Sequence, residues 1–261
     1  MAIKLKNLSI DQTAELLPKN LIFLGYRGSI AHGTHVPQDD PHGIDDKDVM
    51  GIFVGMLSHY FGFDNKDTHE KFIDEWDSVS YEIRKMFSLL LKCNPNVLST
   101  LWLPKHLIIY EDEFGKLIRE NRDIFVSKQA YHAFSGYAYG QLKRMEQFEC
   151  HGYMGEKRKS LVSKFGYDTK NAAHLIRLLR MGIEFLTEGE LHVVREDAKQ
   201  LLEIKKGQWS IDKVKEEANR LFANAEEAFI HSKLPDKPDR QAAELLLSRI
   251  ILGYYRIKQE R

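Results

Sequence analysis

Short apolar runs alternate with helical patterns in the first half of the chain. Residues 21–26 (LIFLGY) form a continuous apolar run of the kind that makes a buried strand, and a glycine-containing turn follows at once. A helical period begins at Tyr81, continues to Leu91 and is expected to stop before Pro95. Further elements are predicted as strands at 49–54, 75–81 and 107–110 and as a short helix at 96–102. The first half therefore has the order of an α/β unit.

The second half shows a helical period almost throughout. Helices are predicted at 127–148, 168–188, 196–206, 210–232 and 238–258. Residues 191–194 (LHVV) instead predict a short strand. The change of pattern near residue 125 predicts two domains, an α/β domain at 1–125 and a helical domain at 126–261.

The two predicted domains also differ in net charge, which is negative in the first and positive in the second. The chain has 38 Lys+Arg and 38 Asp+Glu, a formal net charge of zero. Residues 1–125 hold 14 basic and 19 acidic side chains, whereas residues 126–261 hold 24 and 19. The zero total argues against a protein that coats nucleic acid, since such a protein needs a cationic excess to neutralise phosphates. It leaves room for a local basic groove in the second half.

The cysteines and the lengths of the apolar runs argue against disulfide-rich, zinc-finger and membrane-spanning proteins. Cys93 and Cys150 are too few and too far apart for a disulfide framework or a zinc finger. No apolar run approaches the roughly 18–20 residues that span a bilayer, so no membrane contact is expected. The first twenty residues lack the continuous apolar segment of a secretory signal. We therefore expect a soluble, cytoplasmic protein.

The first candidate chemistry lies where the first strand turns. Gly28 and Ser29 follow that strand and lead into a helix, an arrangement that presents backbone N–H groups and a hydroxyl to a phosphate. Asp46 and Asp48 begin the next strand two positions apart, so their carboxylates lie on one face. Two adjacent oxygen ligands suit Mg²⁺, which often shares its coordination shell with substrate phosphates.

A third carboxylate on a neighbouring strand would complete a two-metal site for reaction at phosphorus. Asp77 is the best candidate, and Glu75, on the same strand face, is the alternative. A lone Gly-Ser or a lone Asp-x-Asp is most often a surface turn or a solvated acidic loop. Their order on consecutive predicted strands makes the functional interpretation much stronger.

Four segments together resemble the nucleotidyltransferases of the DNA polymerase β superfamily. More closely, they are similar to the stand-alone nucleotidyltransferases of that superfamily that are sometimes encoded beside RNA ligases. The segments are GSIAHG (28–33), DKDVMGIF (46–53), YEIRKMFSLLLKCNP (81–95) and KFGYDTKNAAHLIRLLRMG (164–182). They extend over most of the chain.

The resemblance implies an α+β protein, with an N-terminal polymerase-β-like catalytic domain built on a mixed sheet and a C-terminal all-helical domain. It implies a nucleotidyltransferase that moves a nucleoside monophosphate from an NTP such as ATP to an acceptor hydroxyl, releasing pyrophosphate. Mg²⁺ or Mn²⁺ would be held in a two-metal site by the catalytic carboxylates Asp46, Asp48 and Asp77. The association with RNA ligases implies a role in RNA repair, with an RNA end as the acceptor.

One departure from the family pattern concerns the loop between the two motifs. The loop is longer than usual and reads THVPQDDPHGID (34–45), with Asp45 where the family has a serine. Its extra carboxylates, Asp39, Asp40 and Asp45, compete as metal ligands, but Asp46 and Asp48 are preferred because a strand follows them directly.

The second candidate region is the helix predicted at 168–188, within a segment where the basic excess is concentrated. Residues 140–180 hold nine Lys+Arg and four Asp+Glu. Lys170, His174 and Arg177 lie on one helical stripe, and the resemblance assigns them to binding the nucleotide's triphosphate. Tyr167 could stack on a base, and Asp168 could hold a sugar hydroxyl, but structural and capping roles are equally compatible with their positions. His32 is the loop histidine expected to border the nucleotide.

Alternative functions remain open at this point. The acceptor could be a protein hydroxyl, as in protein adenylylation, or a small molecule such as an aminoglycoside. From a different class, the altered acidic loop could have turned the protein into a non-catalytic sensor of nucleotide or RNA.

Overall fold

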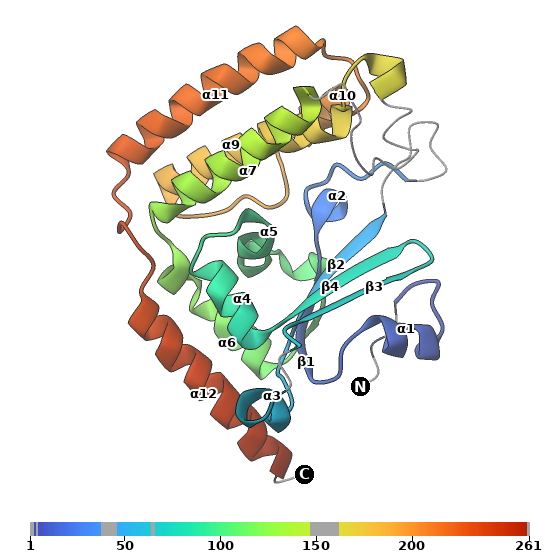
Figure 1. Cartoon of the computed structure of the whole chain (residues 1–261), viewed down its shortest axis with the longest axis vertical. Helices are drawn as coiled ribbons and strands as arrows, with labels where there is room; N and C mark the ends of the chain where they lie inside the picture. The colour runs from blue at the N-terminus through green and yellow to red at the C-terminus, as the bar shows by residue number, and fades with distance from the viewer. Residues whose placement is uncertain (1–2, 4, 38–45, 64–65, 147–161, 260–261) are drawn as a thin grey trace.

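A five-stranded mixed sheet forms the centre of the first half of the molecule. The structure is a computed structural model that describes residues 3, 5–37, 46–63, 66–146 and 162–259 (Figure 1). The strands are β1 (Leu21–Tyr26), β2 (Lys47–Phe53), β3 (Thr68–Ile73), β4 (Trp76–Glu82) and β5 (Ile108–Glu111). Their order across the sheet is β3-β4-β2-β1-β5, so the strands that carry the predicted carboxylates, β2 and β4, are neighbours.

Strand pairing brings two of the predicted carboxylates together. β2 runs parallel to β4 in a register that sets Asp48 opposite Asp77. β1 runs antiparallel to β2 and pairs Tyr26 with Val49, so the turn after β1 begins beside Asp48. Because both carboxylates stand at the same end of two adjacent strands, the sheet itself fixes their separation.

The two faces of the sheet pack against different layers. Alternation along β2 directs Met50 and Ile52 into a large core shared with the helices of the chain. Val49 faces the other way and joins Trp76 and Leu16 in a smaller core beneath the N-terminal segment. Asp48 lies on the same side of the strand as Met50, so its side chain faces the layer of helices.

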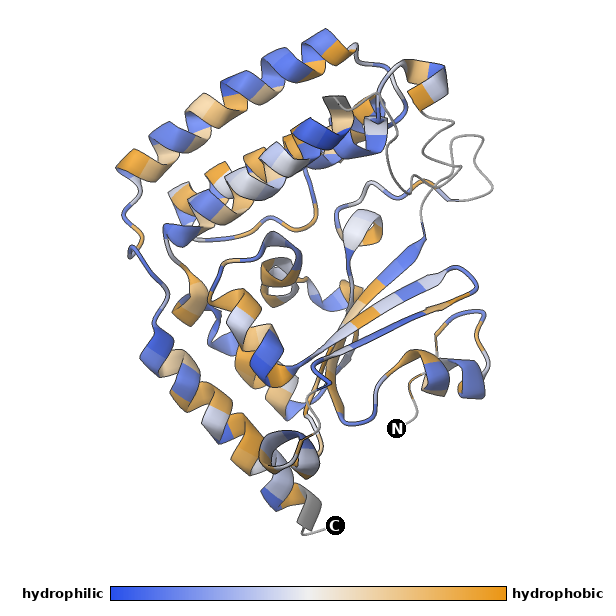
Figure 2. Ribbon diagram, viewed as in Figure 1, coloured by the Kyte–Doolittle hydropathy of each residue, from blue (hydrophilic) through white to orange (hydrophobic). Residues whose placement is uncertain are grey.

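Apart from α1, which packs on the other face, the helices cover one side of the sheet and form a separate layer beyond it (Figures 1 and 2). The shorter helices are α1 (Ile10–Leu16), α2 (Gly28–Ala31), α3 (Leu57–Phe61), α4 (Ile83–Leu90), α5 (Pro95–Leu98), α6 (Glu113–Glu120) and α10 (Ala198–Lys205). The longer ones are α7 (Gln129–Glu146), α9 (Thr169–Glu188), α11 (Ile211–His231) and α12 (Arg240–Gln259). Short 3₁₀ turns are η1 (Ser99–Trp102), η2 (Lys105–Leu107) and η3 (Arg122–Phe125).

This architecture confirms the predicted α+β class, with its mixed sheet and its helical C-terminal region. The predicted strand at 191–194 is wrong, because these residues belong to no strand. Leu191 and Val193 are buried while His192 and Val194 are not, so the alternation reports a segment packed on one side. The sequence also gave no signal for β3, whose residues lie at the edge of the sheet and are partly or fully exposed.

The last helix, α12, leaves the helical layer and returns to the first half of the molecule (Figure 1). It packs against α4, α6 and η3, and the large apolar core runs continuously from Ile22 to Tyr254. The division into domains at 1–125 and 126–261 therefore stays a prediction. In the described part of the chain, no helix combines the length and apolar character needed to cross a membrane.

Candidate active site

The turn after β1 brings its backbone directly against the carboxylate of Asp48. Gly28 has a φ of +60°, a left-handed conformation that side chains disfavour. A Cβ atom at this position would lie 2.4 Å from Oδ2 of Asp48, so both the conformation and the space require glycine. The following helix, α2, is a single turn of four residues. Its dipole is correspondingly small, and the favourable phosphate site expected at a helix N-terminus has to come mainly from charged side chains.

Asp48 is the centre of a cluster of acidic groups. Burial is the main cause that raises its pKa to about 6, and the charges of Asp77 and Asp46 act in the same direction. Arg27 and Lys170 act in the opposite direction. Asp46 precedes β2, and the side chain of Asp77 is 42% exposed at the edge of the same cluster. The alternative ligand Glu75 forms an ion pair with Lys47.

These carboxylates fit a divalent cation that is completed by a substrate. Among the described residues, no group of three or more His, Cys, Asp or Glu side chains is placed to enclose a metal ion. Mg²⁺, however, is commonly bound by one or two carboxylates together with phosphate oxygens and water. Asp48 and Asp77 on paired strands provide that partial ligand set, and the repulsion between them favours a cation there.

Helix α9 presents its predicted basic stripe to the other side of the same cavity. The cavity has a volume of about 280 Å³. Its lining includes the predicted residues Gly28, Ser29, His32, Asp48, Lys170, His174 and Arg177. The spacing of the last three along α9 places them on one helical face, as their positions in the sequence predicted. These predicted residues come from three separate segments, which thus meet around one space.

Arg177 is a buried cation without a carboxylate partner in the described part of the chain. Its side chain is only 6% exposed, and its Nη1 donates to Sδ of Met181 at 3.1 Å, a weak acceptor. Burial, followed by repulsion from Arg195, lowers its pKa to about 9. A guanidinium in this position has unmet demand for an anion, and the cavity is the space that an anion could enter.

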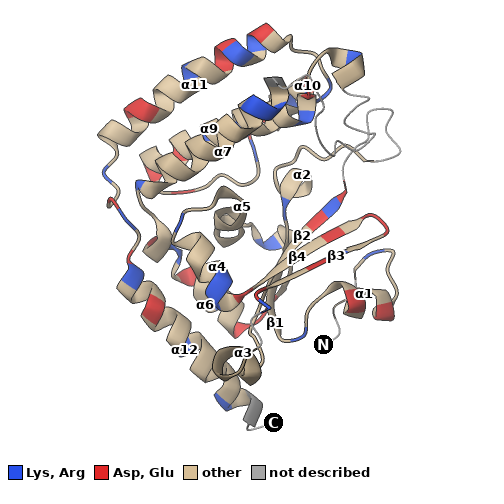
Figure 3. Cartoon of the chain, viewed as in Figure 1, with Lys and Arg blue, Asp and Glu red and all other residues tan. Residues whose placement is uncertain are grey.

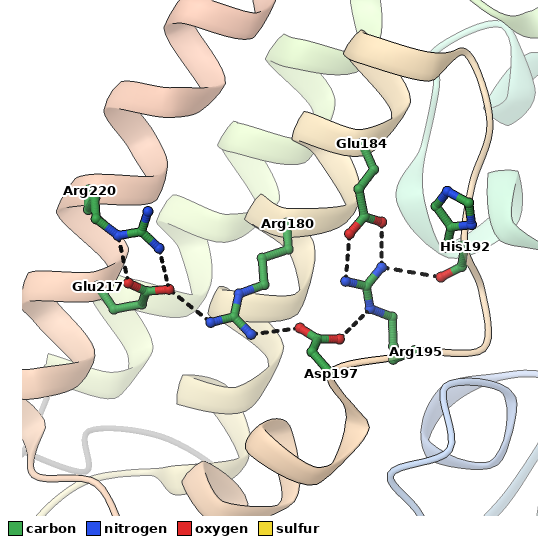
Figure 4. Close-up of polar contacts among 7 residues, drawn as sticks. All are labelled: Arg180, Glu184, His192, Arg195, Asp197, Glu217 and Arg220. Carbon is green, nitrogen blue, oxygen red and sulfur yellow. Dashed lines mark hydrogen bonds and ion pairs between the residues drawn. The ribbon is translucent and has the colours of Figure 1, made fainter.

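The wall beside Arg177 is held by an ion-pair network that ties α9 to α11 and to the segment before α10 (Figure 4). Arg195 donates to Oε1 of Glu184 at 2.7 Å and to Oδ1 of Asp197 at 2.8 Å. Arg180 donates to Oδ2 of Asp197 at 2.6 Å and to Oε1 of Glu217 at 2.8 Å. Arg180 was counted in the basic segment, but its charge is neutralised within this network.

His32 is hydrogen-bonded to the segment that precedes α10. Its Nδ1 lies 2.8 Å from the carbonyl oxygen of Val193, so this ring nitrogen carries a proton and donates it. Burial, followed by the charge of Arg177, lowers the pKa of His32 well below its ordinary value. A neutral imidazole therefore borders the cavity, as a polar wall rather than a further cation.

Tyr167 and Asp168 have structural positions. The Tyr167 ring is 2% exposed, and its hydroxyl donates to the carbonyl oxygen of Trp209 at 2.7 Å. A ring buried in this way is not available for stacking on a base. Asp168 caps α9 by accepting the backbone N–H of Asn171 at 3.0 Å. In the structure, therefore, Tyr167 has a packing role and Asp168 has a capping role.

Several cavity residues were missed from the sequence. They are Arg27, Thr34, Pro95, Asn96, Ser99, Ala173, Leu201 and Lys205. Arg27 immediately precedes the Gly-Ser pair, and Asn96 and Ser99 follow the Asn94-Pro95 end of a motif segment. Their closeness to these motifs in the sequence could have identified them as candidate site residues. Lys205, whose Nζ donates to the carbonyl oxygen of Thr34 at 3.0 Å, lies near no such motif in the sequence. The competing loop carboxylates Asp39, Asp40 and Asp45 lie outside the described residues, and so does part of the basic segment at 140–180, with Lys157, Arg158 and Lys159.

The distribution of charge around the site is uneven (Figure 3). Lys143 and Arg144 are exposed at the end of α7, and Lys164 is exposed just before α9. Acidic groups instead occupy the strand ends, where Asp48 and Asp77 face each other.

Comparison with known proteins identifies the family. A family model described as the RNA repair pathway DNA polymerase beta family, RlaP, matches residues 2–249. No curated protein matches the chain. The match covers both the sheet and the helical layer, and it includes every residue that lines the cavity. The chain belongs to the RNA repair pathway DNA polymerase beta family, and so to the polymerase-β-like nucleotidyltransferases.

Proposed function

We propose that the protein transfers a nucleoside monophosphate from an NTP to a hydroxyl group at an RNA end and releases pyrophosphate. The observation that supports this most strongly is the cavity itself. It has the Asp48 carboxylate and the Gly28-Ser29 turn on one wall and the Lys170, His174 and Arg177 stripe on the other. Oxygen ligands opposite cations are the arrangement that a triphosphate bound with a divalent metal requires.

In the proposed reaction the acceptor oxygen forms a bond to the α-phosphorus while the bond from that phosphorus to the bridging oxygen breaks. The hydroxyl proton passes to solvent water, and pyrophosphate leaves with the bonding electrons. Arg177 and Lys170 offset the charge that gathers on the leaving phosphates. Asp46, Asp48 and Asp77 would hold Mg²⁺ or Mn²⁺, which supplies activation of the hydroxyl and charge stabilisation at phosphorus.

An RNA acceptor is favoured over a protein or a small molecule by two observations. The family is one of RNA repair. The basic side chains Lys143, Arg144 and Lys164, outside the cavity lining, are exposed, and a phosphate backbone is a partner that exposed cations attract.

The test is incubation of the protein with each α-labelled NTP, ATP first, in Mg²⁺ with an RNA bearing a free 3′ hydroxyl. We expect label in the RNA, and loss of that label with EDTA. Asp48→Asn should lower the rate about a hundredfold or more. Asp123→Asn changes an exposed carboxylate in η3 and serves as the matched control, with an unchanged rate.

Two outcomes would redirect the assignment. Label that enters protein extract instead of RNA would make the enzyme a protein nucleotidyltransferase. Nucleotide binding without any transfer would indicate a sensor.

A further inference from the structure

Arg27 bridges two of the carboxylates that would hold the metal. Its backbone N–H donates to the carbonyl oxygen of Asp48 at 3.0 Å, which fixes the start of its side chain. Its Nη2 lies 3.1 Å from Oδ2 of Asp77 and 3.8 Å from Oδ1 of Asp48. One guanidinium nitrogen is therefore shared between two acidic groups on adjacent strands.

In its bridging position Arg27 offsets the repulsion between the two carboxylates, but one of its own hydrogen-bond donors has no acceptor in the described part of the chain. Asp48 and Asp77 stand opposite each other in the parallel register, and two carboxylates so placed repel unless a cation lies between them. The Nε of Arg27, however, is buried and has no hydrogen-bond partner among the described residues. A buried donor without an acceptor costs free energy that another partner could recover.

The phosphates of a bound nucleotide would be suitable acceptors for Arg27. Arg27 lines the cavity together with Gly28 and Ser29, at the wall where the phosphates of a nucleotide are proposed to bind. A guanidinium that leaves the carboxylates can therefore reach phosphate without leaving the site. Its planar group of donors suits two phosphate oxygens as well as it suits carboxylate.

We propose, on the basis of the metal-dependent transfer proposed above, that Arg27 is a resident counter-ion that the divalent metal displaces and that the nucleotide's phosphates then bind. Metal and guanidinium compete for Asp48 and Asp77, so each metal ion bound without nucleotide has to break the ion pairs of Arg27. A bound nucleotide draws Arg27 away and removes that competition. Metal and nucleotide should consequently bind with positive coupling, and by linkage each tightens the other equally.

The test measures Mn²⁺ affinity by electron paramagnetic resonance of the free ion, with and without a non-hydrolysable ATP analogue. In the absence of nucleotide, Arg27→Gln should bind Mn²⁺ about threefold to tenfold more tightly than wild type, because two partly exposed ion pairs no longer compete. Arg27→Lys keeps the charge and should stay close to wild type. The analogue should tighten Mn²⁺ binding less in Arg27→Gln than in wild type, and should itself bind that variant more weakly in Mn²⁺.

Two further variants separate the possible failures. Arg119→Gln removes a comparably exposed ion pair, 3.0 Å from Arg119 Nη1 to Glu111 Oε1, and should leave Mn²⁺ affinity unchanged. Asp48→Asn should abolish Mn²⁺ binding. If Asp48→Asn binds Mn²⁺ like wild type, the proposed metal site fails. If Asp48→Asn loses Mn²⁺ but Arg27→Gln binds it no more tightly than wild type, only the counter-ion role of Arg27 is overturned. Unchanged affinity of Arg27→Gln for the analogue would overturn the transfer of Arg27 to phosphate.

Discussion

At the scale of single residues, Arg177 and Arg180 show how the same side chain has two different uses on one helix. Both lie on α9 three positions apart, and both are largely shielded from water. Arg180 is matched by Asp197 and Glu217, so its charge stabilises the fold. Arg177 faces the cavity, and among the described residues its hydrogen bond is to the thioether of Met181, so the charge of Asp197 offsets its desolvation only in part until an anion binds.

The two arginines should therefore give opposite results when each is replaced by methionine. Arg177→Met removes a buried charge whose desolvation is only partly offset, so the melting temperature without ligand should stay the same or rise. The same variant should weaken NTP binding about tenfold to a hundredfold, since hydrogen bonds to charged groups contribute roughly 1.5–3 kcal/mol. Calorimetric titration and thermal unfolding measure the two effects.

Arg180→Met is the matched control. It should lower the free energy of unfolding by about 1–3 kcal/mol, because Asp197 and Glu217 lose a partner, while NTP affinity changes little. If Arg177→Met destabilised the protein as much as Arg180→Met and left NTP binding intact, Arg177 would be a structural residue.

At the scale of elements, the sequence predicted correctly the helices that have both a clear apolar period and capping residues at their ends. The helix predicted at 168–188 is observed at 169–188, because Asp168 caps its start and Gly189 adopts the left-handed conformation at its end. The strand at 191–194 was wrong because alternation reports burial on one side and not the hydrogen bonds to a neighbouring strand. β3 was missed because an edge strand with exposed faces has no apolar pattern.

The candidate site was predictable to a similar degree. Local motifs located Gly28, Asp48 and the α9 stripe, and regular helical spacing placed the stripe on one face. Arg27 and Lys205 join the site through the strand register and the packing of α10, which are properties of the folded chain. Nothing in a single sequence specifies which carboxylate an arginine will meet fifty positions away.

The turn between β1 and α2 provides a prediction at this scale. Gly28→Ala should lose about 1–2 kcal/mol of stability from its left-handed backbone and, in addition, push Asp48 away. Gly33 has a similar φ of +70°, but a Cβ there would meet its nearest atom at an ordinary 3.6 Å. We expect both alanine variants to melt earlier, and only Gly28→Ala to lose Mn²⁺ binding and transfer. Equal activity of the two would show that the close approach of Gly28 to Asp48 has no functional role.

At the scale of the whole molecule, α12 joins the two halves. This helix comes last in the chain, yet its buried face packs on α4, α6 and η3 of the first half. The rings of Tyr254 and Phe114 meet edge to face at 5.7 Å, and the hydroxyl of Tyr255 donates to the carbonyl oxygen of Gly55. The large apolar core, to which α12 contributes, links the sheet that carries the carboxylates to the layer that carries the cations.

If this coupling is strong, damage to α12 should lower the stability of both halves together. Ile250 is fully buried, and Ile250→Ala should reduce the free energy of unfolding by about 2–4 kcal/mol through lost burial and the cavity left behind. Leu252 lies two positions on and is 72% exposed, so Leu252→Ala should change stability by less than about 0.5 kcal/mol. Neither residue lines the cavity, so NTP affinity well below the melting temperature should be unchanged in both.

The shape of the calorimetric transition decides between two views of the molecule. A single transition that moves to lower temperature in Ile250→Ala would mean that sheet and helical layer unfold as one cooperative unit, consistent with the continuous core. Two transitions, with only the one assigned to the sheet shifted, would mean that 1–125 and 126–261 behave as separate units. In that case the cations of α9 could move relative to Asp48 without unfolding, and closure of the cavity around a nucleotide would be a motion between domains.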